Sequence, residues 1–199
     1  MTPYREQQEA QYRKFKAWQE AQGGRELPVQ LSTYLKPHQQ HRVRWLQEAV
    51  IHPARILEVG CNWGYVLAQV GGQVGLDRSP MALDVARFLN ASLEFVEGEA
   101  TQLPFEDQSF DTVLLPEVLE HLEWPDQVRQ ALTEGFRVAR RQVLATLPNA
   151  GDDEHDEAGS PKHPWLPTVG QLLALEKWFP ERPLHISFIP GFICLRWIF

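Results

Sequence analysis

The sequence predicts an α/β fold, a doubly wound and mostly parallel sheet with helices on both faces. Three observations lead to this prediction. From residue 55 onward, short apolar runs alternate with helix-like segments, which is typical of βα units around a parallel sheet. The first run leads directly into a glycine-containing turn and then a helix. The chain has 199 residues, of which 43% are hydrophobic and 23% charged, which suits one globular domain with a short appendage and excludes a disordered polymer.

The strands are predicted from their apolar runs. Five parallel strands are expected over residues 55–59, 74–76, 93–96, 110–115 and 142–147. After them, residues 184–189 and 192–199 flank Pro190 and Gly191, so the end of the sequence predicts an antiparallel hairpin.

Helices are predicted between these strands. Ser79 and Pro80 have the residue types of an N-cap and a first helical position, so a helix is expected over residues 81–89. Another is predicted to open at Pro125, and a third to cover residues 168–179. The apolar face of the second contains Val128, Leu132, Phe136 and Ala139.

The N-terminal part differs in character and predicts a helical lid. In residues 4–22, Tyr4, Phe15 and Trp18 fall near helical spacing, and two glycines follow. A second helix is expected after Pro37 and before Pro53, with Val43, Trp45, Leu46, Ala49 and Val50 on its buried side. We therefore divide the chain into an N-terminal helical segment, residues 1–54, and a core, residues 55–199.

Charge and cysteine content restrict the environment and the partners. The net charge of −7 divides into +4 for residues 1–55 and −11 for residues 56–199, so nucleic acid is not an expected partner. Cys61 and Cys194 form no metal-ligand spacing or disulfide framework, which favours a reducing compartment. The first 25 residues are polar and no run approaches the roughly 20 apolar residues of a membrane span. We expect a cytoplasmic protein.

The glycine turn after the first strand is the most informative motif. Gly60 and Gly64 let the backbone approach a ligand closely, and the helix that follows presents free N–H donors. A dinucleotide GxGxxG fingerprint would need glycine where this chain has Asn62 and Tyr65, which disfavours a nicotinamide enzyme. Asp77 ends the second strand. A carboxylate at this position either accepts hydrogen bonds from the hydroxyls of a ribose or is a solvated turn residue. A tight turn without a ligand is the alternative for the glycines.

Two later segments complete a resemblance. Residues 98–105 read GEATQLPF and residues 109–122 read SFDTVLLPEVLEHL. Together with the glycine turn EVGCNWG at 58–64 and the acidic Asp77, in this order, they resemble the class I S-adenosylmethionine-dependent methyltransferases of the small methyltransferase-domain type. The resemblance covers about residues 55–149 and implies a Rossmann-like fold, S-adenosyl-L-methionine as cofactor and S-adenosyl-L-homocysteine as product.

The resemblance also implies a cofactor site built from strand ends. Its residues are Glu58, Gly60, Cys61, Asn62 and Gly64 around the methionine part, Asp77 at the ribose, Arg78 and Ser79 at the edge of the adenosine pocket, Glu99 and Ala100 at the adenine, and Pro116 and Glu117 beside the transferable methyl group. Many members have glycine where this chain has Asn62, a residue that tolerates positive φ. Cys61 is interpreted as a packing residue more readily than as a nucleophile.

Three histidines are the candidate general bases, for acceptors that must lose a proton: His121, His155 and His163. The last two lie in a long acidic connection, residues 149–164, whose Asp152, Asp153, His155 and Asp156 are possible metal ligands but fit a solvated loop better. We therefore predict no metal site. Trp63 and Tyr65 either face the sulfonium through their rings or pack on the neighbouring helix.

The methyl acceptor is expected to be a small molecule. The (D/N)PPY motif of amino-methylating relatives is absent, because residues 115–118 read LPEV instead. The basic set of Arg25, Lys36, His38, Arg42, Arg44 and Arg55 either meets an anionic substrate or forms a solvated face. The alternative function is a non-catalytic binding or regulatory module that keeps the fold. The sequence does not indicate an oligomeric state.

Overall fold

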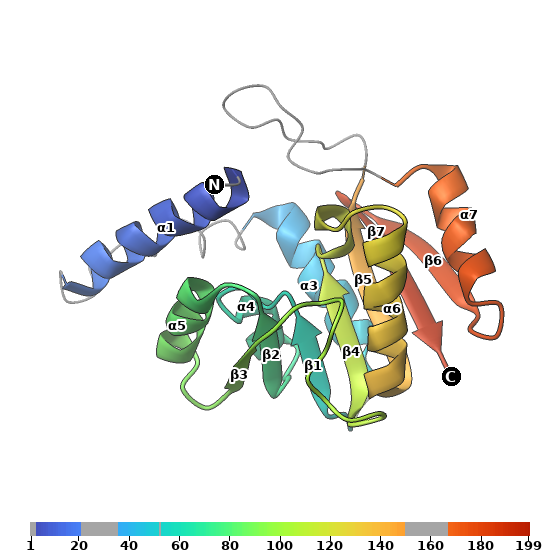
Figure 1. Ribbon diagram of the computed structural model, residues 1–199, viewed down its shortest axis with the longest axis horizontal. Helices are drawn as coiled ribbons and strands as arrows, with labels where there is room; N and C mark the ends of the chain where they lie inside the picture. The colour runs from blue at the N-terminus through green and yellow to red at the C-terminus, as the bar shows by residue number, and fades with distance from the viewer. Residues whose placement is uncertain (1–2, 21–35, 52, 150–166) are drawn as a thin grey trace.

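Seven strands form a single sheet in the order β3-β2-β1-β4-β5-β7-β6 (Figure 1). The computed structural model describes residues 3–20, 36–51, 53–149 and 167–199. Strands β1 to β5 are parallel, whereas β7 runs antiparallel to both β5 and β6. The strands are β1 Ile56–Val59, β2 Val74–Asp77, β3 Glu94–Glu97, β4 Phe110–Pro116, β5 Ala139–Pro148, β6 Leu184–Ile189 and β7 Phe192–Ile198. The predicted α/β fold with its C-terminal hairpin is confirmed.

Helices cover both faces of this sheet. They are α1 Pro3–Glu20, α3 Pro37–Ala49, α4 Tyr65–Gln69, α5 Pro80–Leu89, the 3-10 helix η1 Leu119–His121, α6 Asp126–Val138 and α7 Val169–Trp178. Buried side chains of α3 and α4 pack with Ile56, Leu114 and Leu144 of the sheet, whereas α6 and α7 pack with the strand residues that point the other way. Figure 1 shows α3 behind the strands and α6 in front of them.

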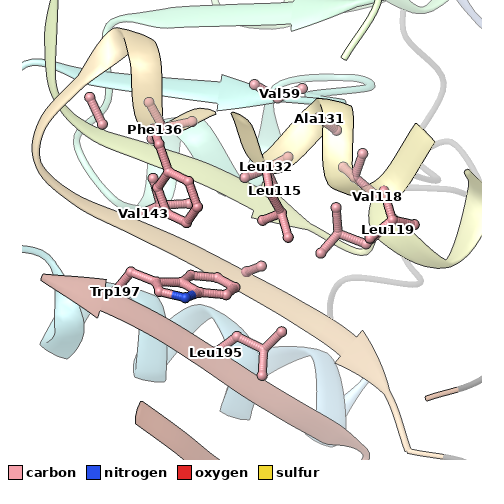
Figure 2. Packing of buried hydrophobic residues seen from close by; sticks show 14 of the residues in the cluster. Val59, Leu115, Val118, Leu119, Ala131, Leu132, Phe136, Val143, Leu195 and Trp197 are labelled. Atoms are coloured by element: carbon pink, nitrogen blue, oxygen red, sulfur yellow. The ribbon is translucent and has the colours of Figure 1, made fainter. Parts of the chain in front are cut away.

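The larger core lies between the sheet and the helices α6 and α7. Strand β4 contributes Val113 and Leu115, strand β7 contributes Leu195 and Trp197, and Phe136 of α6 packs edge-on against Trp197 at 5.4 Å (Figure 2). Because β4 and β5 are covered on both faces, residues 112–116 and 142–148 are buried without alternation, as is typical of central parallel strands.

Two predicted boundaries change. Ala139 was expected on the apolar face of the helix that opens at Pro125, but α6 ends at Val138 and Ala139 begins β5. Strand β5 therefore starts three residues before the predicted residue 142. The reason is tertiary, because Ala139 pairs with Phe110 at the start of β4. The predicted start of α5 is confirmed, since the hydroxyl of Ser79 accepts a hydrogen bond from Ala82 N–H.

The N-terminal helices pack on the rest of the chain. Phe15 of α1 is 1% exposed and contacts Trp63, which follows β1, while α3 buries Val43 and Leu46 against the sheet. The division at residue 54 and the lid role stay predictions. Among the described helices, none combines the length and the apolar character that a membrane span requires.

The strand order also fixes where a ligand crevice lies. The chain runs from β1 to β2 and β3 on one side and from β4 to β5 on the other, so the order reverses between β1 and β4. In open α/β sheets, ligands bind beyond the carboxyl ends of the strands at this point. The glycine turn follows β1, and residues 117–122 follow β4, so both border it.

Candidate cofactor site

The turn after β1 can only be made with glycine at position 60. Gly60 has φ +71°, and its N–H, like that of Cys61, donates to the carbonyl of Leu76 in β2, at 2.7 and 3.0 Å. A Cβ at this position would lie 2.6 Å from Cγ2 of Val118, which follows β4. The two chain segments that border the crevice therefore touch at Gly60, and a side chain would push them apart.

Two further residues of the turn have left-handed backbone conformations. Asn62, which stands where many relatives have glycine, has φ +47°, so the substitution keeps the turn conformation. Gly64 has φ +74° and precedes α4, and a Cβ there would lie 2.8 Å from the ring of Phe95. The backbone of the turn is thus preformed.

Asp77 holds the turn in place from the end of β2. Its carboxylate is 5% exposed and accepts hydrogen bonds from the backbone N–H groups of Asn62, at 2.8 Å, and Ser79, at 2.9 Å. Burial raises the pKa of Asp77, and these hydrogen bonds oppose the rise. Because each carboxylate oxygen accepts more than one hydrogen bond, both remain able to accept from a hydroxyl.

The remaining predicted cofactor residues lie at the same edge of the sheet. Glu99, exposed, and Ala100, half-buried, follow β3, and Glu99 forms a bridge with Gln102. Arg78 is exposed beside the buried Ser79, and Pro116 is the buried last residue of β4. The structure therefore places the whole predicted set at four neighbouring strand ends, although its role in binding stays a prediction.

A buried arginine enters this edge from helix α3. Arg42 is 2% exposed, forms an ion pair with Glu117, and has its guanidinium 5.2 Å from the centre of the Phe192 ring. Glu117 has φ +53°, and its N–H donates to the carbonyl of Thr146 at 2.9 Å. One interpretation of the basic residues near the N-terminus was that they form a solvated face. For Arg42 this interpretation is wrong, because its side chain is buried.

Two glutamates near Arg42 are buried and incompletely paired. Glu58 is 2% exposed and Glu120 is 0% exposed, and one oxygen of Glu58 and both of Glu120 have no hydrogen-bond partner among the described residues. Burial raises the pKa of each to about 8, against the opposing charge of Arg42. Sequence reasoning missed Glu120, although a glutamate directly after Val118 and Leu119 in an apolar run is an available signal.

We expect Glu120 to make stability depend on pH. Its pKa is about 8 in the folded chain, against an ordinary 4.5, so the unfolded chain loses this proton first as pH rises. The free energy of unfolding should therefore fall between about pH 4.5 and 8. Glu120→Gln removes one titrating group and should flatten this slope by up to about 1.4 kcal/mol per pH unit, measured by urea unfolding. The exposed Glu94, replaced by Gln, is the control; an equal slope in Glu120→Gln and the wild type would contradict the assignment.

The predicted general bases are not assembled by the described residues. His121 ends η1 and is exposed. His155 and His163 lie outside the described residues, as do Asp152, Asp153 and Asp156. No group of metal-ligating side chains occurs within the described ranges. The roles of all three histidines stay predictions.

The structure shows the contacts of three residues that the sequence left with more than one interpretation: Cys61, Trp63 and Tyr65. Cys61 is buried, its sulfur would lie 2.7 Å from a Cβ at Gly75, and burial raises the pKa of its thiol, so the thiolate is disfavoured. Trp63 is 3% exposed against Phe15. The hydroxyl of Tyr65 accepts a hydrogen bond from Gln40 at 3.1 Å. Packing is therefore the observed role of the Cys61 and Trp63 side chains.

Comparisons with known proteins agree with this geometry. Residues 57–145 match the family described as "Methyltransferase domain". The mitochondrial ubiquinone biosynthesis O-methyltransferase of Schizosaccharomyces pombe is 38% identical over 106 residues, which is 47% of this chain and 38% of that protein. A tRNA U34 carboxymethyltransferase of Sulfurimonas denitrificans is 26% identical over 136 residues, 62% of this chain and 46% of that protein. The chain thus matches less than half the length of these relatives.

Solved structures share the fold at low sequence identity. The PH0226 protein of Pyrococcus horikoshii superposes with a TM-score of 0.65 and 18% identity, covering 80% of this chain and 88% of that one. A protein of Thermotoga maritima, described as an S-adenosylmethionine-dependent methyltransferase and possible histamine N-methyltransferase, has a TM-score of 0.63 and 17% identity over 84% of this chain and 95% of that one. Over residues 57–145 the sequence therefore resembles the methyltransferase-domain family, and the solved structures share its fold.

Proposed function

We propose that this protein transfers a methyl group from S-adenosyl-L-methionine to an acceptor. The observation that carries the proposal is the preformed turn after β1, in which Gly60 and Gly64 leave no room for a Cβ and Asp77 fixes the backbone from the next strand. This cradle fits the methionine part of the cofactor, and the Asp77 carboxylate fits its ribose hydroxyls. When bound, the cofactor supplies a methyl group that its sulfonium already activates.

In such a reaction, the protein positions the cofactor and the acceptor and excludes water from between them. Gly60, Asn62 and Gly64 would hold the methionine part, and Glu99 and Ala100 the adenine. Pro116 and Glu117, at the end of β4, would border the methyl group and aim the acceptor along the line of displacement. Fixing the reacting groups in line supplies roughly 7–11 kcal/mol in favourable cases, so a dedicated base is required only for an acceptor that must lose a proton.

The acceptor that we propose is a small molecule bearing a nucleophilic oxygen. The name of the S. pombe relative, an O-methyltransferase, supports the oxygen, and the missing (D/N)PPY motif argues against base amino groups. If this oxygen belongs to a hydroxyl group, the acceptor must lose a proton, for which His121, His155 and His163 remain the proposed bases. Because one relative is a tRNA U34 carboxymethyltransferase, RNA is the alternative class of acceptor that must be tested. Isotopically labelled cofactor is added to cell extract with the protein, and the labelled products are identified by mass spectrometry. Label in RNA instead of a small molecule would contradict the acceptor class.

Replacement of Asp77 by Ala tests the cofactor site. The variant should bind S-adenosylmethionine and S-adenosylhomocysteine about 5- to 150-fold more weakly in calorimetry, because it loses hydrogen bonds to the ribose worth about 1–3 kcal/mol. Both compounds should lose affinity equally, since both carry the ribose. Glu97→Ala, which removes an exposed carboxylate at the end of β3, is the matched control. Unchanged affinity in a folded Asp77→Ala variant, or NADH binding in place of both compounds, would refute the proposal.

A further inference from the structure

A groove outside the cofactor site lies between helix α3 and the β6–β7 hairpin. It consists of two adjoining hollows of about 260 and 200 Å³. The first is lined by Trp45, His185, Ser187, Arg196 and Ile198. The second is lined by His41, Arg44, Trp45, Glu48, Ile189 and Pro190. Trp45 lines both, so the two hollows meet at its side chain.

The periodicity of each element explains why these residues face one another. His41, Arg44, Trp45 and Glu48 are spaced three, four and seven residues from the first, so they share one face of α3. In the hairpin, His185 pairs with Arg196, and alternation along the strands puts both on the side that faces α3. The groove is therefore built mainly from two regular elements, with Pro190 of the hairpin turn also in its lining.

Among its charged side chains, the groove has two arginines and one carboxylate. Within the described ranges, neither Arg44 nor Arg196 forms an ion pair, and the Nε of Arg196 is a buried donor with no acceptor. One carboxylate, Glu48, lines the groove beside the two guanidinium and two imidazole groups. Arg42, two residues before Arg44 on α3, by contrast forms an ion pair with Glu117. A buried donor without an acceptor is costly, so the groove is suited to an anion.

The arrangement of charge and ring specifies the kind of anion. Each hollow carries one arginine, and the half-buried Trp45 ring lies at their junction. Guanidinium groups bind phosphate, and an indole face stacks on a nucleobase. We propose that it binds a nucleotide with its base against Trp45 and a phosphate on each side, at Arg44 and Arg196.

Fluorescence anisotropy with a short fluorescein-labelled oligouridylate tests this site without requiring methyl transfer. Arg44→Gln and Arg196→Gln should each weaken binding about tenfold and lower the slope of log affinity against log salt by about one. Arg129→Gln, on the exposed surface of α6, is the matched control and should leave both quantities unchanged. Arg44 is exposed, so its variant should retain the wild-type fold even if Arg196→Gln does not.

Competition identifies the source of the nucleotide. Displacement of the probe by comparable concentrations of free uridine 3′,5′-bisphosphate indicates a free nucleotide as the ligand, whereas retention of the probe indicates a nucleic acid strand. Absence of probe binding would overturn the proposal, as would an equal loss in Arg129→Gln. Arg44-dependent binding to phosphatidylglycerol vesicles without binding to the oligonucleotide would overturn it in favour of a lipid surface. None of these outcomes bears on S-adenosylmethionine binding, which calorimetry measures separately.

Discussion

Replacement of Gly60 by Ala should destabilise the protein by about 2–5 kcal/mol and abolish measurable cofactor binding. Two costs add. An L-residue at φ +71° costs about 1–2 kcal/mol, and a Cβ placed 2.6 Å from Val118 forces a shift that costs about 1–3 kcal/mol. Urea unfolding measures the loss of stability. Calorimetry with S-adenosylmethionine measures the loss of cofactor binding.

Gly71 provides a control for the backbone cost alone. It has φ +70°, nearly the same as Gly60, but a Cβ there would meet nothing within 4 Å. Gly71→Ala should therefore cost only about 1–2 kcal/mol and leave cofactor affinity unchanged. If the two variants were equally stable, the contact between the turns after β1 and β4 would carry no energetic weight.

Replacement of Arg42 by Met should cost about 3–5 kcal/mol above pH 8, because it leaves the half-buried carboxylate of Glu117 without its cation beside the buried Glu58 and Glu120. The loss should shrink below pH 8, where Glu58 and Glu120, each with a pKa of about 8, gain protons and no longer need a counterion. Unfolding free energies at several pH values measure both effects.

Two variants make this result specific. Arg44→Met, two residues along α3, removes an exposed guanidinium that has no ion pair within the described ranges, and should change stability by less than about 0.5 kcal/mol. Adding Glu117→Gln to Arg42→Met should restore part of the loss, because it removes the orphaned charge. A cost that is independent of pH, with no recovery in the double variant, would assign Arg42 a packing role only.

The fold could be predicted because its signals are local. Strands β1, β2, β4 and β5 are largely buried runs whose apolar character shows in the sequence, and Ser79 with Pro80 marks the start of α5. The predicted cofactor residues could be placed together because each lies near or beyond the carboxyl end of a strand, and parallel strands bring these ends to one edge. The boundary at Ala139 failed because its pairing with Phe110 is a tertiary contact that no local pattern contains.

The charge cluster could not be predicted from local patterns. Arg42 has basic neighbours on α3 and resembles them in the sequence, yet it is buried whereas Arg44 is exposed. Only the packing of Val43 and Leu46 on the sheet decides which side of the helix turns inward. Its partner Glu117 is 75 positions away, and the ion pair exists only once α3 lies against the end of β4.

The position of β7 has a consequence for synthesis of the chain. This strand is inserted between β5 and β6 and buries Trp197 completely against Phe136. On the ribosome, the nascent polypeptide cannot complete its main core until residue 197 has left the exit tunnel, so the edge of β5 that pairs with β7 stays open until then. Such late, long-range pairing slows folding and prolongs the exposure of aggregation-prone surface during synthesis.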